Sequence, residues 1–240
     1  MVSFIYPTPP NGSRRINNIE VINVSVVGDA DIDTCILEWN GINESMDKIG
    51  NGWYVYCQKA KVTSDGTTYF YRVYVDDSFG NMNATPQQWF RENAKPEVNV
   101  TIIPTNPTTI DDLNCSVSGW DKDGDNLYYY FRWYKNGQLV YESYQNLSYY
   151  VILHGNTTKN DVWNCSVIPY DGYENGSMKF DSRIILNSPP TLDSIQVNQT
   201  CVAYNQPVEV TSINASDNDK DDLILRISSY PKGFDLCNST

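Results

Sequence analysis

One acidic pattern, Asp-x-Asp-x-Asp, occurs three times in the chain, and its spacing sets the size of the folding unit. The three copies begin at Asp29, Asp121 and Asp217, at intervals of 92 and 96 residues. Each copy follows a segment in which Val, Ile or Leu alternates with polar residues: 21–27, 113–117 and 208–213. Such alternation predicts a strand with one buried face. The repeat therefore predicts an all-β chain built from modules of about 95 residues.

Turn signals inside the modules predict immunoglobulin-like β-sandwiches. In the first two modules the strand after the acidic pattern carries a tryptophan, Trp39 or Trp133, and an Asn-Gly dipeptide follows, which favours a tight hairpin. Prolines after Asn93 and Asn187 predict extended linkers. We expect all-β, tandem immunoglobulin-like sandwiches, two complete and a third partial, over residues 1–93, 94–188 and 189–240.

The six cysteines fall two to a module: Cys35, Cys57, Cys115, Cys165, Cys201 and Cys237. Cys115, Trp133 and Cys165 stand in the order Cys…Trp…Cys that joins two sheets across an immunoglobulin core. Cys35 and Cys57 lie on two further predicted strands and are expected to pair. A bridge between Cys201 and Cys237 follows only by elimination, since six cysteines allow fifteen pairings.

Thirteen Asn-x-Ser/Thr sequons predict a heavily N-glycosylated chain. Their asparagines are Asn11, Asn23, Asn43, Asn83, Asn99, Asn114, Asn146, Asn156, Asn164, Asn175, Asn198, Asn214 and Asn238. Because strand side chains alternate, an inward Cys115 or Cys165 places its neighbour Asn114 or Asn164 outward. A chain with N-linked glycans has crossed a membrane, so we expect an extracellular, cell-surface location that permits disulfides.

The charge balance and the histidine count exclude several classes of function. Acidic residues outnumber basic ones by 29 to 17, which argues against a nucleic-acid partner, since phosphates are bound by Lys and Arg. The single histidine argues against His-based triads and His-based metal sites, and we expect no enzyme. No run of apolar residues is long enough to predict a membrane span within this stretch.

The acidic patterns are the candidate metal sites. Calcium takes six to eight oxygen ligands, which a curled acidic loop can supply. Asp77 and Asp171 end later strands and could complete the sites of their modules. The candidate ligands are Asp29, Asp31, Asp33, Asp77, Asp121, Asp123, Asp125, Asp171, Asp217, Asp219 and Asp221. The alternative is that these residues only form turns, because Asp side chains bond their own backbone.

The first module carries a string of motifs that points to a family. In order, these are residues 3–13 (SFIYPTPPNGS), 22–25, 29–33, 37–41, 43–46, 52–55, 65–66, 71–74 and 77–81. The string resembles the immunoglobulin-like repeat of long, glycosylated cell-surface proteins of archaea. Residues 95–187 are similar to a related immunoglobulin or cadherin-like repeat, and 188–240 to the start of another. The resemblance implies a surface location and a tandem array, and it carries over no catalytic residues.

These observations favour a structural component of an archaeal cell surface or extracellular filament, such as a stalk, a surface layer or a filament subunit. Its partners would be copies of itself or neighbouring surface proteins. A third module that lacks strands could be completed by strand exchange between subunits, although a fragment of a longer chain explains it more simply. The alternatives are an adhesion or carbohydrate-binding module and the accessory region of a secreted hydrolase.

Overall fold

The computed structural model describes residues 1–197 and 210–225, and these residues are almost entirely β-structure. The one helical element among them is a 3-10 turn, η1 (His154–Asn156). No helix in this part of the chain is long and apolar enough to cross a membrane. The predicted fold class, tandem immunoglobulin-like sandwiches, is confirmed by the sheets described below.

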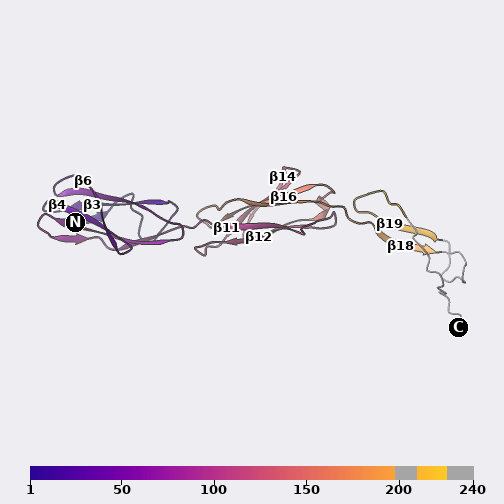
Figure 1. Ribbon diagram of the computed structural model, residues 1–240, viewed down its shortest axis with the longest axis horizontal. Helices are drawn as coiled ribbons and strands as arrows, with labels where there is room; N and C mark the ends of the chain where they lie inside the picture. Colours follow the sequence, from indigo (N-terminus) through magenta and orange to yellow (C-terminus); the bar gives the residue numbers. More distant parts are fainter. Residues whose placement is uncertain (198–209, 226–240) are drawn as a thin grey trace, which may run out of the picture. The chain divides into compact units, whose positions relative to one another are not determined.

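The first sandwich consists of two sheets (Figure 1). One has the order β1 (Val2–Phe4), β3 (Ile19–Val27), β7 (Tyr54–Val62), β6 (Asp47–Ile49). The other has the order β2 (Ser13–Arg15), β10 (Gln88–Glu92), β8 (Thr68–Asp77), β4 (Ile32–Trp39), β5 (Ile42–Ser45), and β9 (Met82–Ala84) also pairs with β8. The pairing of β10 with β2 is parallel, whereas the others are antiparallel.

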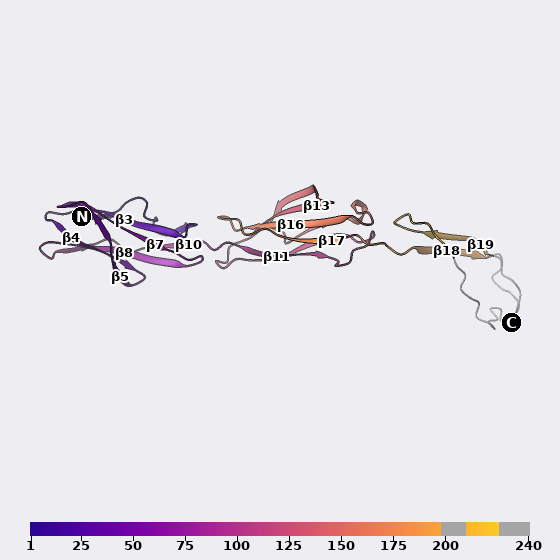
Figure 2. The same cartoon turned by 45° about the horizontal axis from the view of Figure 1, so that its top comes forward.

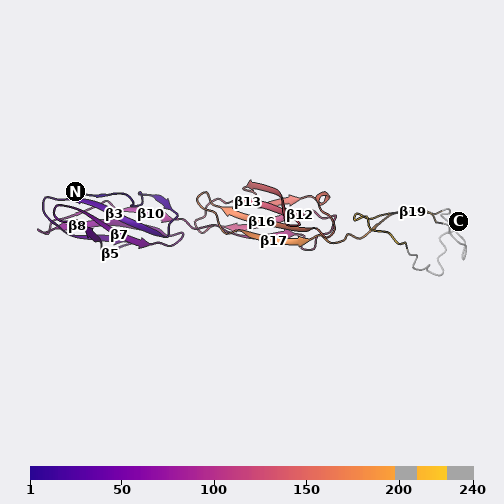
Figure 3. The same ribbon diagram turned by 90° about the horizontal axis from the view of Figure 1, so that it is seen from above.

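The alternation in β3 shows why this sequence forms a sandwich. Ile22, Val24 and Val26 are at most 1% exposed, while the residues between them are half-buried on the outer face. Figure 3 shows β3 beside β7, its partner along its whole length. Leu37 of β4 and Val73 of β8 fill the same core from the opposite sheet, so the two sheets bury each other's apolar faces.

The second sandwich has the two-sheet arrangement that the Cys…Trp…Cys order predicts. Its sheets have the orders β11 (Glu97–Ile103), β12 (Leu113–Trp120), β15 (Tyr149–Ile152) and β14 (Gln138–Gln145), β13 (Tyr128–Lys135), β16 (Val162–Tyr170), β17 (Lys179–Ile184). Figure 2 shows β13, β16 and β17 as neighbours. Asn136 and Gly137, between β13 and β14, both have positive φ, as a type I′ hairpin requires.

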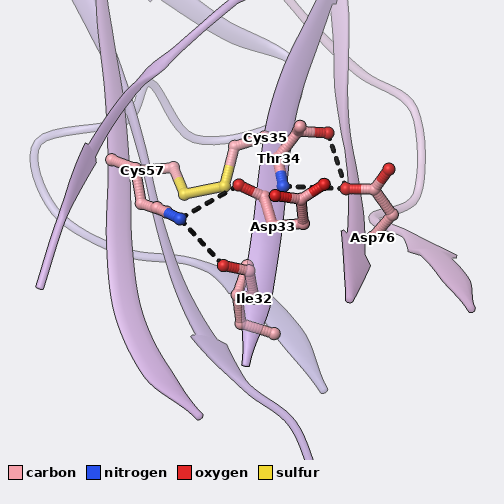
Figure 4. The surroundings of a disulfide bond; sticks show 7 residues. Ile32, Asp33, Thr34, Cys35, Cys57 and Asp76 are labelled. Carbon is pink, nitrogen blue, oxygen red and sulfur yellow. Dashed lines mark hydrogen bonds between the residues drawn. A yellow bond between two sulfur atoms is a disulfide. The ribbon is translucent and has the colours of Figure 1, made fainter. Parts of the chain in front are cut away.

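Two disulfides within the described part of the chain connect the sheets of the sandwiches. Cys115 of β12 pairs with Cys165 of β16, and Trp133 packs edge-on against Trp163 in the same core, with both indoles at most 1% exposed. Cys35 of β4 pairs with Cys57 of β7 (Figure 4).

The two remaining cysteines, Cys201 and Cys237, lie outside the described residues. The described part of the third module consists of β18 (Thr191–Val197) paired antiparallel with β19 (Val210–Ser216).

The chain divides into two compact units, and the division passes through the second sandwich. The first unit contains residues 1–98, 119–130 and 168–178, and the second contains the remaining described residues. Residues 119–130, which include the second acidic loop, therefore belong to the same unit as the first sandwich. The predicted boundary near residues 93–96 lies inside the first unit.

Replacing Cys115 and Cys165 together by Ala should destabilise the second sandwich. The bridge closes a loop with a sequence separation of 50 residues, so its loss should lower the free energy of unfolding by about 3–4 kcal/mol. Urea unfolding followed by tryptophan fluorescence would measure this change. The matched double substitution of Cys35 and Cys57 should destabilise the first sandwich instead, and identical unfolding curves for the two variants would contradict the assignment.

Candidate functional site: the aspartate loops

The second acidic loop curls back on itself directly after β12. The Asp121 carboxylate accepts hydrogen bonds from the backbone N–H groups of Asp123 (2.7 Å) and Asp125 (3.3 Å). Gly124 donates its N–H to the Asp121 carbonyl at 3.2 Å and has a φ of +77°, which a glycine adopts without strain. A straight strand would hold these aspartates too far apart to act together. The curl brings them into one loop.

Asp123 connects this loop to the linker between the first two modules. Its side chain is fully buried and accepts a hydrogen bond from the backbone N–H of Ala94 at 2.8 Å. It also forms ion pairs with Arg91 and, at 3.5 Å, with Arg14. A buried carboxylate is stable only when it is paired and hydrogen-bonded, and here both conditions are met within the first compact unit.

Asp171, after β16, holds the linker from a second side. Its Oδ1 accepts the N–H groups of Tyr173 and Glu174, both at 2.7 Å. Its Oδ2 accepts a hydrogen bond from the Asn93 side-chain amide at 2.8 Å. Asn93 is 1% exposed, and its amide oxygen accepts a hydrogen bond from Arg14 at 2.9 Å. The side-chain nitrogen and the side-chain oxygen of Asn93 are therefore both hydrogen-bonded.

Three carboxylates of this cluster converge. Asp121, Asp125 and Asp171 each offer an oxygen, and these oxygens lie within 4.8 Å of one another. The Oδ2 atom of Asp121 is buried and has no hydrogen-bond partner. Asp125 is also paired with Arg14. The donor set is of the kind that a hard divalent cation prefers, while Arg14 offsets part of its negative charge.

The third acidic loop repeats the geometry of the second in the other compact unit. Asp217 accepts the N–H groups of Asp219 (2.8 Å) and Asp221 (3.3 Å), and Lys220, at the position of Gly124, also has a positive φ. Asp219 accepts the N–H of Ser188 at 2.6 Å and its hydroxyl at 3.0 Å.

The outer aspartate of the third loop also has a basic partner. Lys159 donates to Asp221 at 2.7 Å, and this hydrogen bond raises the pKa of the lysine. Hydrogen bonds from the Thr109 side chain, and then from Ser188, hold the pKa of the Asp219 carboxyl below its usual range. The oxygens of Asp217, Asp219 and Asp221 form the second converging group among the described residues.

The two loops therefore use equivalent residues for equivalent contacts. The first aspartate turns the loop, the middle one accepts the N–H of a linker residue, and the last one pairs with a basic side chain. Ala94 and Ser188, the linker residues, each follow an asparagine and are 3% and 1% exposed. The same amide–carboxylate contact thus occurs independently at the start of two modules.

The first acidic loop is built differently. Asp76, not an aspartate of the loop, accepts the N–H (2.8 Å) and hydroxyl (2.6 Å) of Thr34, and Lys48 donates to the carbonyls of Ile32 and Asp33. Figure 4 shows Asp76 directed at Thr34.

Asp77, the expected fourth ligand of that module, bonds its own turn instead. It accepts the N–H groups of Phe79 and Asn81, and the Asn81 side chain lowers its pKa. Among the described residues, Asp29, Asp31, Asp33 and Asp77 belong to no converging group of three acidic side chains. Asp77 therefore bonds its own turn, as the turn-forming alternative predicts.

The sequon asparagines lie mostly on the surface. The exposed ones are Asn11, Asn43, Asn83, Asn99, Asn146, Asn156, Asn175 and Asn214, whereas Asn23, Asn114 and Asn164 are half-buried. Asn23 donates its side-chain amide to the Tyr6 carbonyl at 3.2 Å. Asn198 and Asn238 lie outside the described residues.

Three residues of the linker cluster were not predicted from the sequence: Arg14, Arg91 and Asn93. Arg14, which precedes Arg15, and Arg91 belong to no repeated pattern, so no sequence signal predicted their contacts with Asp123. Asn93 did have a sequence signal, because Asn93 and Asn187 each precede the linker residue that an acidic loop binds.

Comparison with known proteins finds no matching family model and no matching curated protein. Three solved structures are similar at low identity. The fibronectin(III)-like modules of CbhA from Clostridium thermocellum are 15% identical, with a TM-score of 0.35, over 78% of this chain and 94% of that one. The FN1–FN3 domains of chicken CNTN1 are 12% identical, with a TM-score of 0.36, over 85% and 75%. Dimeric latent PorU from Porphyromonas gingivalis is 13% identical, with a TM-score of 0.32, over 78% and 20%. The fold assignment rests on the sheet topology of this chain.

Replacing Asp123 by Asn should destabilise the first compact unit. The substitution removes a buried charge and leaves Arg91 without its carboxylate, so the free energy of unfolding should fall by roughly 2–4 kcal/mol. Chemical denaturation would measure the change. The matched control is Asp33→Asn in the first loop, where the side chain is exposed and the effect should stay within about 0.5 kcal/mol. Equal effects of the two substitutions would contradict the role of Asp123.

Proposed function

We propose that this chain is part of a glycosylated structural protein of an extracellular surface or filament, in which tandem β-sandwiches act as spacers. The observation that carries the proposal is the repeated contact between an acidic loop and the linker before it. Neither catalysis nor binding by a single domain requires the same contact at two linkers. A linear array of modules does require it, because each module is attached to its neighbour in the same way.

Other features of the chain support a structural role outside the cell. Each complete sandwich has a disulfide across its core, which is typical of proteins that fold in an oxidising compartment. The exposed sequons would carry glycans that solubilise the outer faces. The resemblance of the first module to repeats of archaeal surface proteins supports an archaeal cell surface as the location. Assembly by strand exchange remains a prediction about the third module.

Calcium is part of this proposal at two places. At the second loop the ligands would be Asp121, Asp125 and Asp171, and the buried Oδ2 of Asp121, which has no partner, fits a cation. At the third loop they would be Asp217, Asp219 and Asp221. A bound cation would offset the mutual repulsion of these carboxylates, and so it would stabilise the loops that hold the linkers.

Calcium should therefore raise the melting temperature of the full chain. Calcium at a hundred times its dissociation constant stabilises a folded protein by about 2.7 kcal/mol. Differential scanning calorimetry in calcium and in EDTA would measure the shift. Asp125→Asn should reduce it, whereas Asp29→Asn, in the first loop, should leave it intact. An unchanged melting temperature in EDTA would show that the loops serve only as turns.

The structural role itself is tested by locating the protein in native material. An antibody raised against residues 1–197 should label a repeating extracellular filament or lattice in electron micrographs. Label found only on a secreted hydrolase would support the accessory-region alternative. Specific hits on a glycan array, without a labelled assembly, would support the carbohydrate-binding alternative.

A further inference from the structure

The outer face of the second sandwich exposes apolar side chains around a sequon. In the pairing of β16 with β17, Val162 lies opposite Ile184 and Ser166 lies opposite Phe180. Val162, Ile184 and Phe180 are 41%, 56% and 64% exposed. Exposed apolar side chains that gather on one face of a sheet often mark a place that another group covers.

Asn164 occupies the middle of this group. It lies opposite Ser182, two positions along the ladder from the pair Val162–Ile184 on one side and from the pair Ser166–Phe180 on the other. Diagonal neighbours on one face of an antiparallel pair lie roughly 7–8 Å apart, within reach of a bulky group. Because Cys165 points into the core, where it is fully buried, Asn164 points to the outer face together with Ser182 and Phe180.

We propose that the N-linked glycan of Asn164 lies on this apolar face and covers Phe180 and Ile184. The inference rests on the glycosylation included in the proposed function and adds a role for one glycan. A sugar ring has an apolar C–H face that stacks on aromatic and aliphatic side chains, while its hydroxyl groups remain in water. The patch of Val162, Phe180 and Ile184 is uncharged, which suits a neutral sugar.

The equivalent sequon on the opposite sheet offers a contrast. Asn114 lies opposite Val151 of β15, and the pair two positions further along, on the same face, is Ser116 with Tyr149. The side-chain oxygen of Asn114 is buried without a hydrogen-bond partner. Val151 and Tyr149 are 39% and 49% exposed, less than Ile184 and Phe180, so the face around Asn164 offers the more exposed apolar side chains.

The first measurement is the occupancy of each sequon in the full chain, produced in a host that attaches N-linked glycans. Mass spectrometry of peptides after enzymatic deglycosylation should show Asn164 occupied. If other sequons are occupied and Asn164 is not, this inference is overturned and the proposed function stands. If no sequon is occupied, the glycoprotein part of the proposed function also fails.

The second measurement is hydroxyl-radical footprinting of side chains, which reports the exposure of Phe180 directly. Asn164→Gln should raise the labelling rate of Phe180 by roughly threefold, because a stacked sugar removes most of the exposed ring area. Asn146→Gln removes a sequon from the turn after β14 and should leave that rate unchanged. Phe79, 82% exposed in the first sandwich, serves as an internal reference.

A double substitution separates stacking from general effects of glycan loss. With Phe180 replaced by Ser, removing the Asn164 glycan should change the labelling of Ile184 and the melting temperature less than it does in the native chain. Equal Phe180 labelling in the native, Asn164→Gln and Asn146→Gln proteins would overturn the proposal.

Discussion

The contact between an aspartate and the amide of the preceding linker is the interaction on which the tandem arrangement depends. A linker that becomes buried must satisfy its backbone N–H groups, and two of the buried linker residues, Ala94 and Ser188, donate theirs to Asp123 and Asp219. A carboxylate is a strong acceptor for this purpose because it is charged. In its second and third copies, the acidic pattern therefore holds a linker as well as turning the chain.

The same device explains how the chain distributes its charge. Its formal net charge is −12, yet the outer aspartate of each linker-binding loop is paired with a basic residue, Arg14 or Lys159. These two side chains come from different elements and share no sequence pattern. The second and third modules share one arrangement. In each, the loop carries three carboxylates, and a basic side chain nearby neutralises part of their charge. A cation at the converging oxygens would complete the neutralisation.

Much of the fold could be predicted from the sequence because strand alternation and Asn-Gly turns are local signals. The Cys115–Cys165 bridge followed from a pattern in the chain itself. The linker cluster could not be predicted in full, because Arg14 and Arg91 reach Asp123 from strands far away in sequence. The three Asp-x-Asp-x-Asp segments are similar in sequence, but the first differs in structure, since Asp76 and Lys48 bind its backbone.

Hydrogen exchange at single linker amides, followed by NMR on the full chain, is the most direct test of this account. The Ala94 and Ser188 amides should exchange as slowly as amides within the strands, because each is buried and bonded to a carboxylate. The amide of the exposed Lys95, one residue further on, provides the comparison and should exchange faster. Exchange of Ala94 and Ser188 at the rate of an unstructured peptide would contradict the claim that the acidic loops hold the linkers.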